Sequence, residues 1–440
     1  MTERIMQFGE GNFLRGFADY FIHKLNEKEL FDGSVVIIKP TDRGNIDVFK
    51  EQSCRYNLFL RGIENGQEVS EITKITSVSR IINPYNEWQA CLSLAKNPDI
   101  EFVISNTTEA GIVFDKNCKF EDTPPKAFPA KLTAMLYERY SAGLDGLIIL
   151  PCELIDNNGN ELQKCVLRYT QQWKLGEDFY NWLISENKFC NTLVDRIVTG
   201  YPKEEAEELC RQIGYNDKLL DTAEIYHLWV IEGSFEDKLP LQKAGFNVVW
   251  TDNVKPYKKR KVRLLNGAHT SMVCAALLAG VQTVGECMSD EDIYSYMHKC
   301  VYDEILKAIG EGDEDIAFAK AVEDRFRNPY ISHQLRSIVL NCVSKFSVRV
   351  VPSILDYKKK LGVYPEALTM SLAALIYLYK NDIPNDDTEI MDFIKANSVN
   401  EILKSTKLWS ADLSDLSDMV NNYYRIIEKH GMRECVRKIL

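Results

Sequence analysis

Residues 4–17, RIMQFGEGNFLRGF, combine a short apolar run, a glycine-rich turn and the beginning of a helical pattern. The apolar run has the length and composition of a buried strand. The glycines at positions 9 and 11 let the backbone turn tightly and approach a bound group closely. This order of strand, turn and helix is typical of the first unit of an α/β domain.

The turn also suggests a binding site, because free N–H groups at a helix N-terminus stabilise the charge of a pyrophosphate. Compared with the G-x-G-x-x-G pattern, Leu14 replaces the third glycine, and the next glycine is Gly16. Its place directly after the first strand favours a dinucleotide site at Gly9, Gly11, Asn12 and Phe13. A G-x-G turn with a purely structural role is the alternative.

Strand-like runs alternate with amphipathic helical stretches through the first half of the chain. This alternation predicts an α/β fold with a doubly wound, mostly parallel sheet of the Rossmann type and helices on both faces. The predicted strands are residues 4–8, 35–39, 101–105, 146–150, 192–198 and 227–232. Residues 56–61 and 68–72, on either side of an Asn65-Gly66 turn, instead predict a hairpin.

The second half of the chain has a different pattern, with helical periodicity almost without interruption from residue 262 to residue 440. Strand patterns end near residues 252–257. We therefore expect two domains, a Rossmann-type domain over residues 1–254 and an all-helical domain over residues 255–440. Predicted helices include residues 271–278, 292–308, 333–343, 365–379 and 413–429.

Composition narrows the class of function. The 440 residues carry a formal net charge of −11, which lacks the electrostatic footprint of a nucleic-acid-binding protein. The 12 cysteines are scattered without a C-x-x-C pair, which indicates reduced thiols and argues against a structural zinc site. No signal peptide or membrane-spanning run is recognisable. We expect a cytoplasmic protein with no nucleic-acid or membrane partner.

Polar loops follow two further predicted strands. After the second strand, Asp42 is a candidate to bind an adenosine ribose, whereas Lys39 and Arg43 would suit a 2′-phosphate. An equally simple interpretation is that these three side chains are solvated loop charges that bind no cofactor. After the third parallel strand, Asn106, Thr107 and Thr108 are candidates to contact the ribose or amide of a dinucleotide; a plain helix N-cap is the alternative for the two threonines.

Residues 255–270, KPYKKRKVRLLNGAHT, carry the clearest chemical signal. A solvated basic patch before a helix is the simple reading. However, Asn266 and His269 share one side of a helix, and Lys261 at its entrance can reach the same point. An amine, an amide and an imidazole suit a carbonyl or alcohol centre, where one group moves a proton and two hold the oxygen. Crowding by Lys259, Arg260 and Arg263 is expected to favour loss of a proton from Lys261.

The spacing Lys-x4-Asn-x2-His resembles the signature of the polyol-specific long-chain dehydrogenases, the mannitol dehydrogenase family. The resemblance extends over the chain, through QFGEGNFLR (7–15), SNTTEAG (105–111), PCELID (151–156), LVDRIV (193–198) and RFRNPYI (325–331). It implies an NAD-linked, metal-independent interconversion of a secondary alcohol and a ketone. Lys261 would be the general acid/base, Asn266 and His269 would polarise the oxygen, and Asp195 would lie in the site, where we group it with the cofactor-binding residues.

At two positions this sequence differs from the mannitol-oxidising members of the family that it resembles. Leu154 stands where those members have an asparagine that binds the reacting oxygen, and Lys258 stands where they have a glutamate. The resemblance within the family favours a linear sugar acid and its keto form as the substrate pair. Another hexitol or aldonate dehydrogenase and a dinucleotide-binding sensor without turnover are the alternatives.

A sugar-acid substrate would need cationic side chains that bind its carboxylate. His333 and Arg336 are three residues apart on a predicted helix, and Arg325 precedes them in RFRNPYI. We expect these three side chains to bind the carboxylate and hydroxyls, because a guanidinium makes paired hydrogen bonds to a carboxylate. Structural salt bridges are the alternative.

Overall fold

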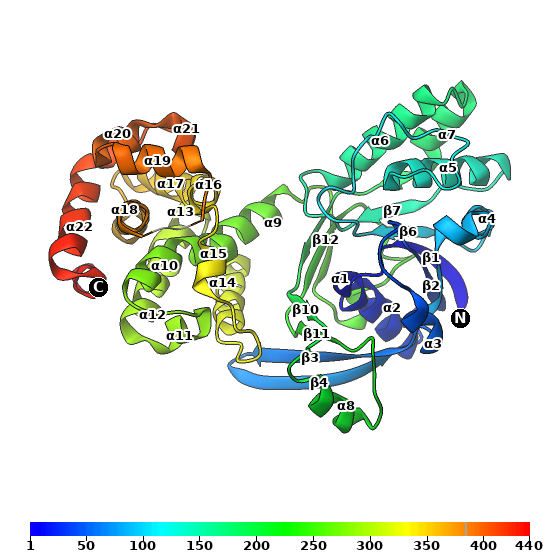
Figure 1. The fold of residues 1–440 in the computed structure, drawn as a ribbon, viewed down its shortest axis with the longest axis horizontal. Coiled ribbons are helices and arrows are strands. Elements are labelled where there is room, and N and C mark those ends of the chain that lie inside the picture. Colours follow the sequence, from blue (N-terminus) through cyan, green and yellow to red (C-terminus); the bar gives the residue numbers. More distant parts are fainter. Residues whose placement is uncertain (383–384) are drawn as a thin grey trace. The chain divides into compact units, whose positions relative to one another are not determined.

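The computed structural model describes residues 1–382 and 385–440, which form two compact units (Figure 1). The first unit contains residues 1–61 and 69–254, and the second contains residues 62–68 and 255–440. The sequence had assigned all of residues 1–254 to the first domain. Residues 62–68 form the end of a hairpin with nine-residue strands, and such a segment can belong to a different unit from its base.

A six-stranded parallel sheet forms the framework of the first unit. Its strand order is β5 (Val78–Ile82), β2 (Gly33–Ile38), β1 (Thr2–Phe8), β6 (Phe102–Ser105), β7 (Ile148–Pro151) and β8 (Lys188–Phe189). Every pair of neighbours is parallel. The chain begins in the middle of the sheet, builds outward to β5 and returns to place β6 on the other side of β1, so the predicted doubly wound fold is confirmed.

Both faces of this sheet are buried, because apolar side chains of alternate residues enter two separate cores. One core contains Ile5, Ile37 and Ile104 with the helices α1 (Asn12–Arg15) and α2 (Ala18–Glu27). The other contains Met6, Ile38 and Val103. Four helices cover this second face, namely α4 (Pro84–Ala95), α5 (Phe128–Ser141), α6 (Asn158–Gln172) and α7 (Glu177–Glu186).

Two smaller sheets contain the remaining strands of the first unit. One has the order β10 (Val198–Gly200), β11 (Asp221–Glu224), β3 (Tyr56–Glu64) and β4 (Gln67–Ile75), which confirms the predicted hairpin. The other has the order β13 (Val248–Thr251), β12 (Leu228–Glu232) and β9 (Thr192–Asp195). The predicted strands over 192–198 and 227–232 therefore exist, but they pair antiparallel to each other outside the main sheet. Short helices complete the unit: α3 (Asp47–Glu51), α8 (Ala206–Ile213) and η1 (Gln242–Ala244).

Apart from the hairpin end at residues 62–68, the second unit is built from helices. It begins with α9 (Lys255–Arg260), the π-helix η2 (Lys261–Asn266) and α10 (Gly267–Leu278). The following helices are α11 (Val284–Ser289), α12 (Glu291–His298), the π-helix η3 (Lys299–Ile305), α13 (Leu306–Ile309) and α14 (Asp313–Phe326). The last are α15 (Leu335–Ile338), α16 (Cys342–Arg349), α17 (Val351–Leu361), α18 (Glu366–Asn381), α19 (Thr388–Ala396), α20 (Val399–Lys404), α21 (Thr406–Trp409), η4 (Ser414–Leu416), α22 (Ser417–His430) and α23 (Met432–Arg437).

The predicted helix over residues 333–343 is wrong in its extent. Helix α15 has only four residues, and α16 starts after Asn341, whose φ of 50° lies in the left-handed region. An α-helix cannot continue through a residue in that conformation. His333 lies before α15, so it does not share a helix face with Arg336.

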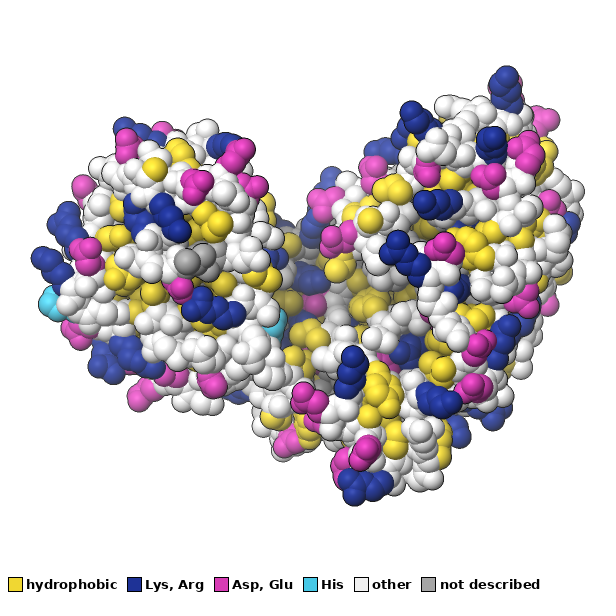
Figure 2. Space-filling model, in the orientation of Figure 1, with side chains coloured by type: hydrophobic (Ala, Val, Ile, Leu, Met, Phe, Trp, Pro, Cys, Tyr) yellow, Lys and Arg dark blue, Asp and Glu magenta, His cyan; other side chains and the backbone are white. Residues whose placement is uncertain are grey.

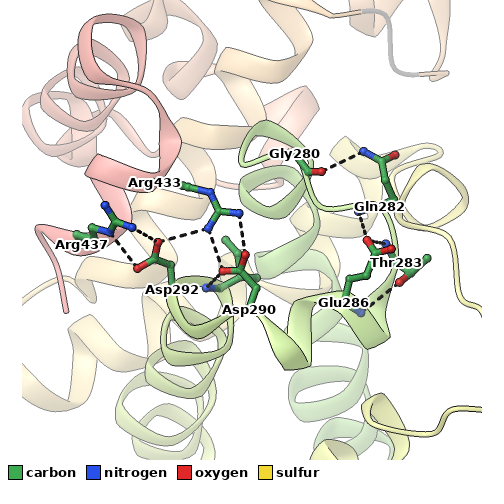
Figure 3. A network of polar contacts seen from close by, with 9 residues as sticks. Gly280, Gln282, Thr283, Glu286, Asp290, Asp292, Arg433 and Arg437 are labelled. Carbon is green, nitrogen blue, oxygen red and sulfur yellow. Dashed lines mark hydrogen bonds and ion pairs between the residues drawn. The ribbon is translucent and has the colours of Figure 1, made fainter.

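Ion pairs tie the C-terminal helix α23 to the start of α12 (Figure 3). Arg433 Nη2 lies 2.7 Å from Asp290 Oδ2, and Arg437 Nη2 lies 2.8 Å from Asp292 Oδ2. Asp290 also caps α12, because its Oδ1 accepts a hydrogen bond from the Ile293 N–H at 3.1 Å. One carboxylate therefore stabilises both the helix N-terminus and the docked end of the chain.

The distribution of charge on the surface agrees with a composition that contains both basic and acidic residues in large number. Basic and acidic side chains are interspersed over the face shown in Figure 2. Among residues 1–382 and 385–440, no helix is both long enough and apolar enough to cross a lipid bilayer.

Arg139 provides a test of how the first unit is held together. Its buried guanidinium donates hydrogen bonds to four backbone carbonyls at the ends of α4 and α5 and before β6, those of Ala95, Asn97, Ile100 and Asp145. We expect Arg139→Met to lower the free energy of unfolding by about 3 kcal/mol, because the carbonyls lose their donor. Urea denaturation measures this change. Arg211→Met, at an exposed ion pair, should cost less than about 1 kcal/mol, and equal losses would contradict the assignment.

Candidate active site

The glycine-rich turn lies at the carboxyl end of β1, between the ends of β2 and β6. Gly9 has a φ of +132°, and a Cβ atom there would lie 2.9 Å from the backbone oxygen of Asn106. Only glycine allows this close approach of the two loops. At Gly11, which caps α1, a Cβ would meet no atom within 4 Å. The backbone of the turn is therefore open to an approaching group.

Leu14, at the third position of the glycine pattern, has a structural explanation. Its side chain is fully buried, and its Cδ1 atom lies 3.2 Å from the position that a Cβ of Gly9 would take. Beside it, Asn12 is exposed and its Oδ1 accepts a hydrogen bond from Arg15, while Phe13 stacks on Phe17 with ring centroids 4.9 Å apart. Side chains of the core thus support the turn from below. The cofactor contacts of Asn12 and Phe13 stay predictions.

The structure of the loop after β2 shows which of its charged residues are accessible to a cofactor. Lys39 is buried, and its ammonium donates to the backbone oxygens of Gly44 at 2.6 Å and Asp42 at 3.3 Å. It is therefore not exposed to bind a 2′-phosphate. Asp42 and Arg43 are exposed side chains of this loop, so Asp42 stays the candidate for the ribose and Arg43 the candidate for a 2′-phosphate.

The loop after β6 is held by a residue to which the sequence analysis gave no role. Glu153 is buried, and its Oε1 accepts hydrogen bonds from the backbone N–H and the hydroxyl of Thr107, both at 2.9 Å. Its Oε2 accepts from the hydroxyl of Ser105 at 3.0 Å. Burial raises the pKa of Glu153, whereas the bonds from Thr107 oppose that rise. Asn106 donates to the backbone oxygen of Cys152 at 2.8 Å, so four hydrogen bonds join the end of β6 and the loop after it to the segment that follows β7.

The helix-cap alternative for the two threonines is wrong. Residues 106–127 contain no helix, and α5 begins only at Phe128. Thr108 is exposed with a φ of 72°, a conformation that β-branched residues rarely adopt. Asp195 is buried at the end of β9, where it pairs with Leu228 of β12. The roles of Thr107, Thr108 and Asp195 toward a cofactor stay predictions.

In the second unit, Lys261 and Asn266 are the first and last residues of the π-helix η2. Hydrogen bonds in a π-helix join residues five positions apart, so these two residues are the ends of one such turn. The sequence had predicted an ordinary helix. His269 follows on the first turn of α10, and all three side chains are half-buried. The predicted triad is therefore presented by two consecutive helical segments of different pitch.

The like-charge crowding expected around Lys261 is offset by carboxylates. Arg260 pairs with Asp315 at 2.6 Å, and Arg263 pairs with Asp356 at 3.1 Å. Lys259 lies 3.8 Å from the same Asp356. The basic run is thus neither a bare solvated patch nor an uncompensated cluster, because helices α14 and α17 supply its counter-charges.

His269 lies in an aromatic and cationic environment. Its ring stacks on Phe326 with centroids 4.1 Å apart and meets the ring of His333 edge-on at 5.2 Å. Burial holds the pKa of His269 well below its usual value, and the charges of Arg325 and Arg349 lower it further, together with His333. The imidazole is therefore neutral at physiological pH and carries one N–H donor.

The three predicted carboxylate ligands are placed differently. Arg325 is buried near His269, and His333 contacts the His269 ring. Arg336 is 56% exposed and pairs with Asp382 at 2.8 Å. Arg349, which the sequence analysis missed, is the last residue of α16, contributes to the low pKa of His269, and donates to Thr270 Oγ1 at 3.3 Å. No motif marked Arg349, because it lies 80 residues from His269.

Comparison with known proteins places both halves of the chain in one family. Residues 3–243 match the mannitol dehydrogenase Rossmann domain, and residues 253–429 match the mannitol dehydrogenase C-terminal domain. The chain belongs to the mannitol dehydrogenase family. Altronate oxidoreductases from Escherichia coli O7:K1 (strain IAI39 / ExPEC) and Shigella flexneri serotype 5b (strain 8401) are each 44% identical to it, over 99% of this chain and 97% of theirs.

Solved structures show the same fold. Substrate-free D-sorbitol dehydrogenase has a TM-score of 0.86 at 21% identity, covering 99% of this chain and 95% of its own. Mannitol 2-dehydrogenase of Pseudomonas fluorescens, in a ternary complex with NAD and D-mannitol, has a TM-score of 0.72 at 22% identity, covering 100% of this chain and 94% of its own. Within this mannitol dehydrogenase fold, Leu154 lies three residues after the end of β7 and is 63% exposed, and its side chain offers no hydrogen-bond donor.

The protonation of His269 provides a direct test of this site. We expect its NMR titration to show a neutral ring at pH 6, because burial and nearby cations disfavour the imidazolium. Arg349→Met should raise the pKa of His269, since it removes one of those cations. Arg437→Met, at an exposed ion pair with Asp292, should leave it unchanged. An imidazole that titrates near pH 6.5 in the parent protein would contradict the assignment.

Proposed function

We propose that this protein is an NAD-dependent oxidoreductase of the cytoplasm that interconverts D-altronate and D-tagaturonate. The observation that carries the proposal is the 44% identity to altronate oxidoreductases over 99% of the chain. The cationic surroundings of His269 support an anionic substrate, because Arg325 and Arg349 bring two guanidinium groups to the predicted reaction centre.

The first unit offers residues that fit a dinucleotide. The turn at Gly9 and Gly11 leaves its backbone accessible, and it lies where the strand order of the sheet reverses, which is where such sheets bind ligands. Asn106, Thr107 and Asp42 are at the ends of the neighbouring strands. When bound, NADH supplies the hydride that reduces the substrate carbon.

The residues of the second unit would handle the proton and the oxygen charge. In reduction of the ketone, Lys261 donates a proton from its ammonium to the carbonyl oxygen, and it accepts that proton back in alcohol oxidation. Asn266 and the neutral His269 donate hydrogen bonds to the same oxygen and stabilise the charge that develops there. An imidazolium at position 269 would compete with Lys261 as the acid, so the low pKa of His269 keeps the two roles separate.

Substitution of Lys261 tests this mechanism. We expect Lys261→Met to reduce kcat by about 10²–10⁴-fold, the usual contribution of a general acid/base. The Kd for NADH should change little, because the predicted dinucleotide contacts are on other residues. Lys404→Met makes the same substitution at an exposed helical site and should keep parental turnover. A Lys261→Met variant with parental kcat would mean that another group moves the proton.

Substrate charge provides a second test. We expect Arg349→Met to raise KM for tagaturonate by about 10–100-fold, because it removes charge-assisted hydrogen bonds to the carboxylate. Activity toward the neutral ketohexose of matching stereochemistry should be unaffected. The same measurement on Arg325→Met, His333→Gln and Arg336→Met ranks the predicted ligands, and Arg437→Met is the control. Equal loss on charged and neutral substrates would exclude a carboxylate clamp.

The substrate epimer needs its own measurement. Fructuronate and other hexitol or aldonate substrates differ from the proposed pair in hydroxyl stereochemistry. NADH oxidation measured over a panel of keto-uronates and ketohexoses distinguishes them. Preference for fructuronate would replace the proposed substrate, and NADH binding without turnover on any member would favour a dinucleotide sensor.

A further inference from the structure

The loop that follows β2 has an irregular backbone at a functionally sensitive position. Residues 40–45 form no helix or strand, and all of them except Pro40 are exposed. In a doubly wound sheet, this loop meets the adenosine end of a dinucleotide. Its conformation must therefore be held by contacts other than regular backbone hydrogen bonds.

Two buried ammonium groups hold the backbone of this loop. Lys39 binds the carbonyls of Asp42 and Gly44 from within the loop. Lys131, which has no exposed surface, reaches the loop from helix α5, and its Nζ lies 3.0 Å from the carbonyl oxygen of Pro40. Pro40 is the first residue after Lys39, so the loop is anchored at its start and near its end.

Every donor of the Lys131 ammonium has an acceptor. Besides Pro40, Nζ donates to the hydroxyl of Tyr85 at 3.1 Å and to the carbonyl oxygen of Lys126 at 2.7 Å. An ammonium has three N–H groups, and all three are used. The hydroxyl of Tyr85 also donates to the Pro40 oxygen at 3.4 Å, so α4 and α5 converge on one backbone carbonyl of the loop.

Packing alone does not explain a lysine at this position. The rest of the buried face of α5 is largely apolar, as in Leu132, Met135 and Leu136, and a methionine would fill similar space. Burial of a charged amine costs free energy unless hydrogen bonds compensate for it. Here the compensating bonds go to the loop and its supports, so the amine specifies where Pro40 lies.

We propose that Lys131 is a positioning residue for the adenosine end of the dinucleotide, acting through the carbonyl of Pro40 on the loop that carries Asp42. This inference rests on the proposed use of NAD. It assigns Lys131 no contact with substrate and no part in proton transfer. Loss of the ammonium should therefore weaken NADH binding and leave kcat unchanged.

The environment of the amine makes this effect depend on pH. Burial lowers the pKa of Lys131 to about 8, against the opposing influence of Cys118, Cys91 of α4 and Asp42 of the loop. The remaining titratable group in contact is Tyr85, whose pKa burial raises. As pH rises through 8, the ammonium loses one of its three donors, so the loop is held less firmly and the affinity for NADH should fall.

The test is a fluorescence titration of NADH with the parent enzyme and with Lys131→Met at pH 7 and pH 9. We expect Lys131→Met to raise the Kd at pH 7 by roughly 5–30-fold, as for loss of one or two hydrogen bonds. The Kd of the parent should rise from pH 7 to pH 9, whereas that of Lys131→Met should rise less. Turnover of tagaturonate at saturating NADH should be parental.

Two further variants separate positioning from general stability. Lys126→Met removes an exposed side chain but keeps the carbonyl that Lys131 binds, so its Kd should be parental. Tyr85→Phe removes one acceptor of Lys131 with little change of shape, and it should raise the Kd in the same direction by a smaller factor. This variant decides the question if Lys131→Met does not fold.

The outcomes distinguish the inference from the proposed function. A parental Kd for Lys131→Met overturns the role of Lys131 and leaves the use of NAD intact. If Lys131→Met does not fold, a parental Kd for Tyr85→Phe has the same meaning. Reduced kcat with a parental Kd also overturns it. A parent enzyme that does not bind NADH overturns the proposed function itself.

Discussion

The close approach of two backbone segments at the centre of the main sheet constrains the first unit. Gly9 and Asn106 end neighbouring parallel strands, and a Cβ on Gly9 would lie 2.9 Å from the Asn106 oxygen. With glycine there, the β1 turn and the β6 loop lie side by side where the strand order reverses. The buried carboxylate of Glu153 then joins the β6 loop to β7 through Ser105 and Thr107.

In the second unit, the constraint is the close spacing of positively charged side chains. Its basic run contains several cations close in sequence, yet Arg260 and Arg263 are neutralised by carboxylates of α14 and α17. Arg325 and Arg349 instead contribute to the environment of His269 and help keep its ring neutral. The partners of a cation thus show whether it has a structural role or is suited to bind an anionic ligand. The residue type alone does not show this.

Local patterns predicted much of the fold. Runs of apolar residues located β1, β2 and β6, because strands buried on both faces are continuously hydrophobic. The same signal found β9 and β12 but could not show that they pair antiparallel in a separate sheet, since partner choice depends on residues distant in the chain. Helix periodicity over residues 333–343 likewise did not reveal the left-handed Asn341, so His333 and Arg336 were wrongly placed on one helix face.

The sequence by itself determined the Rossmann-type architecture, and it predicts a boundary near residue 254 and a site at Lys261, Asn266 and His269, because these depend on short-range spacing and residue type. Only the tertiary structure revealed the π-helix that presents Lys261 and Asn266, the charge of Arg349 acting on His269, and the hold of Lys131 on Pro40. The last two features join segments tens of residues apart. Burial, pKa and hydrogen-bond partners arise from such contacts, and a linear pattern does not encode them locally.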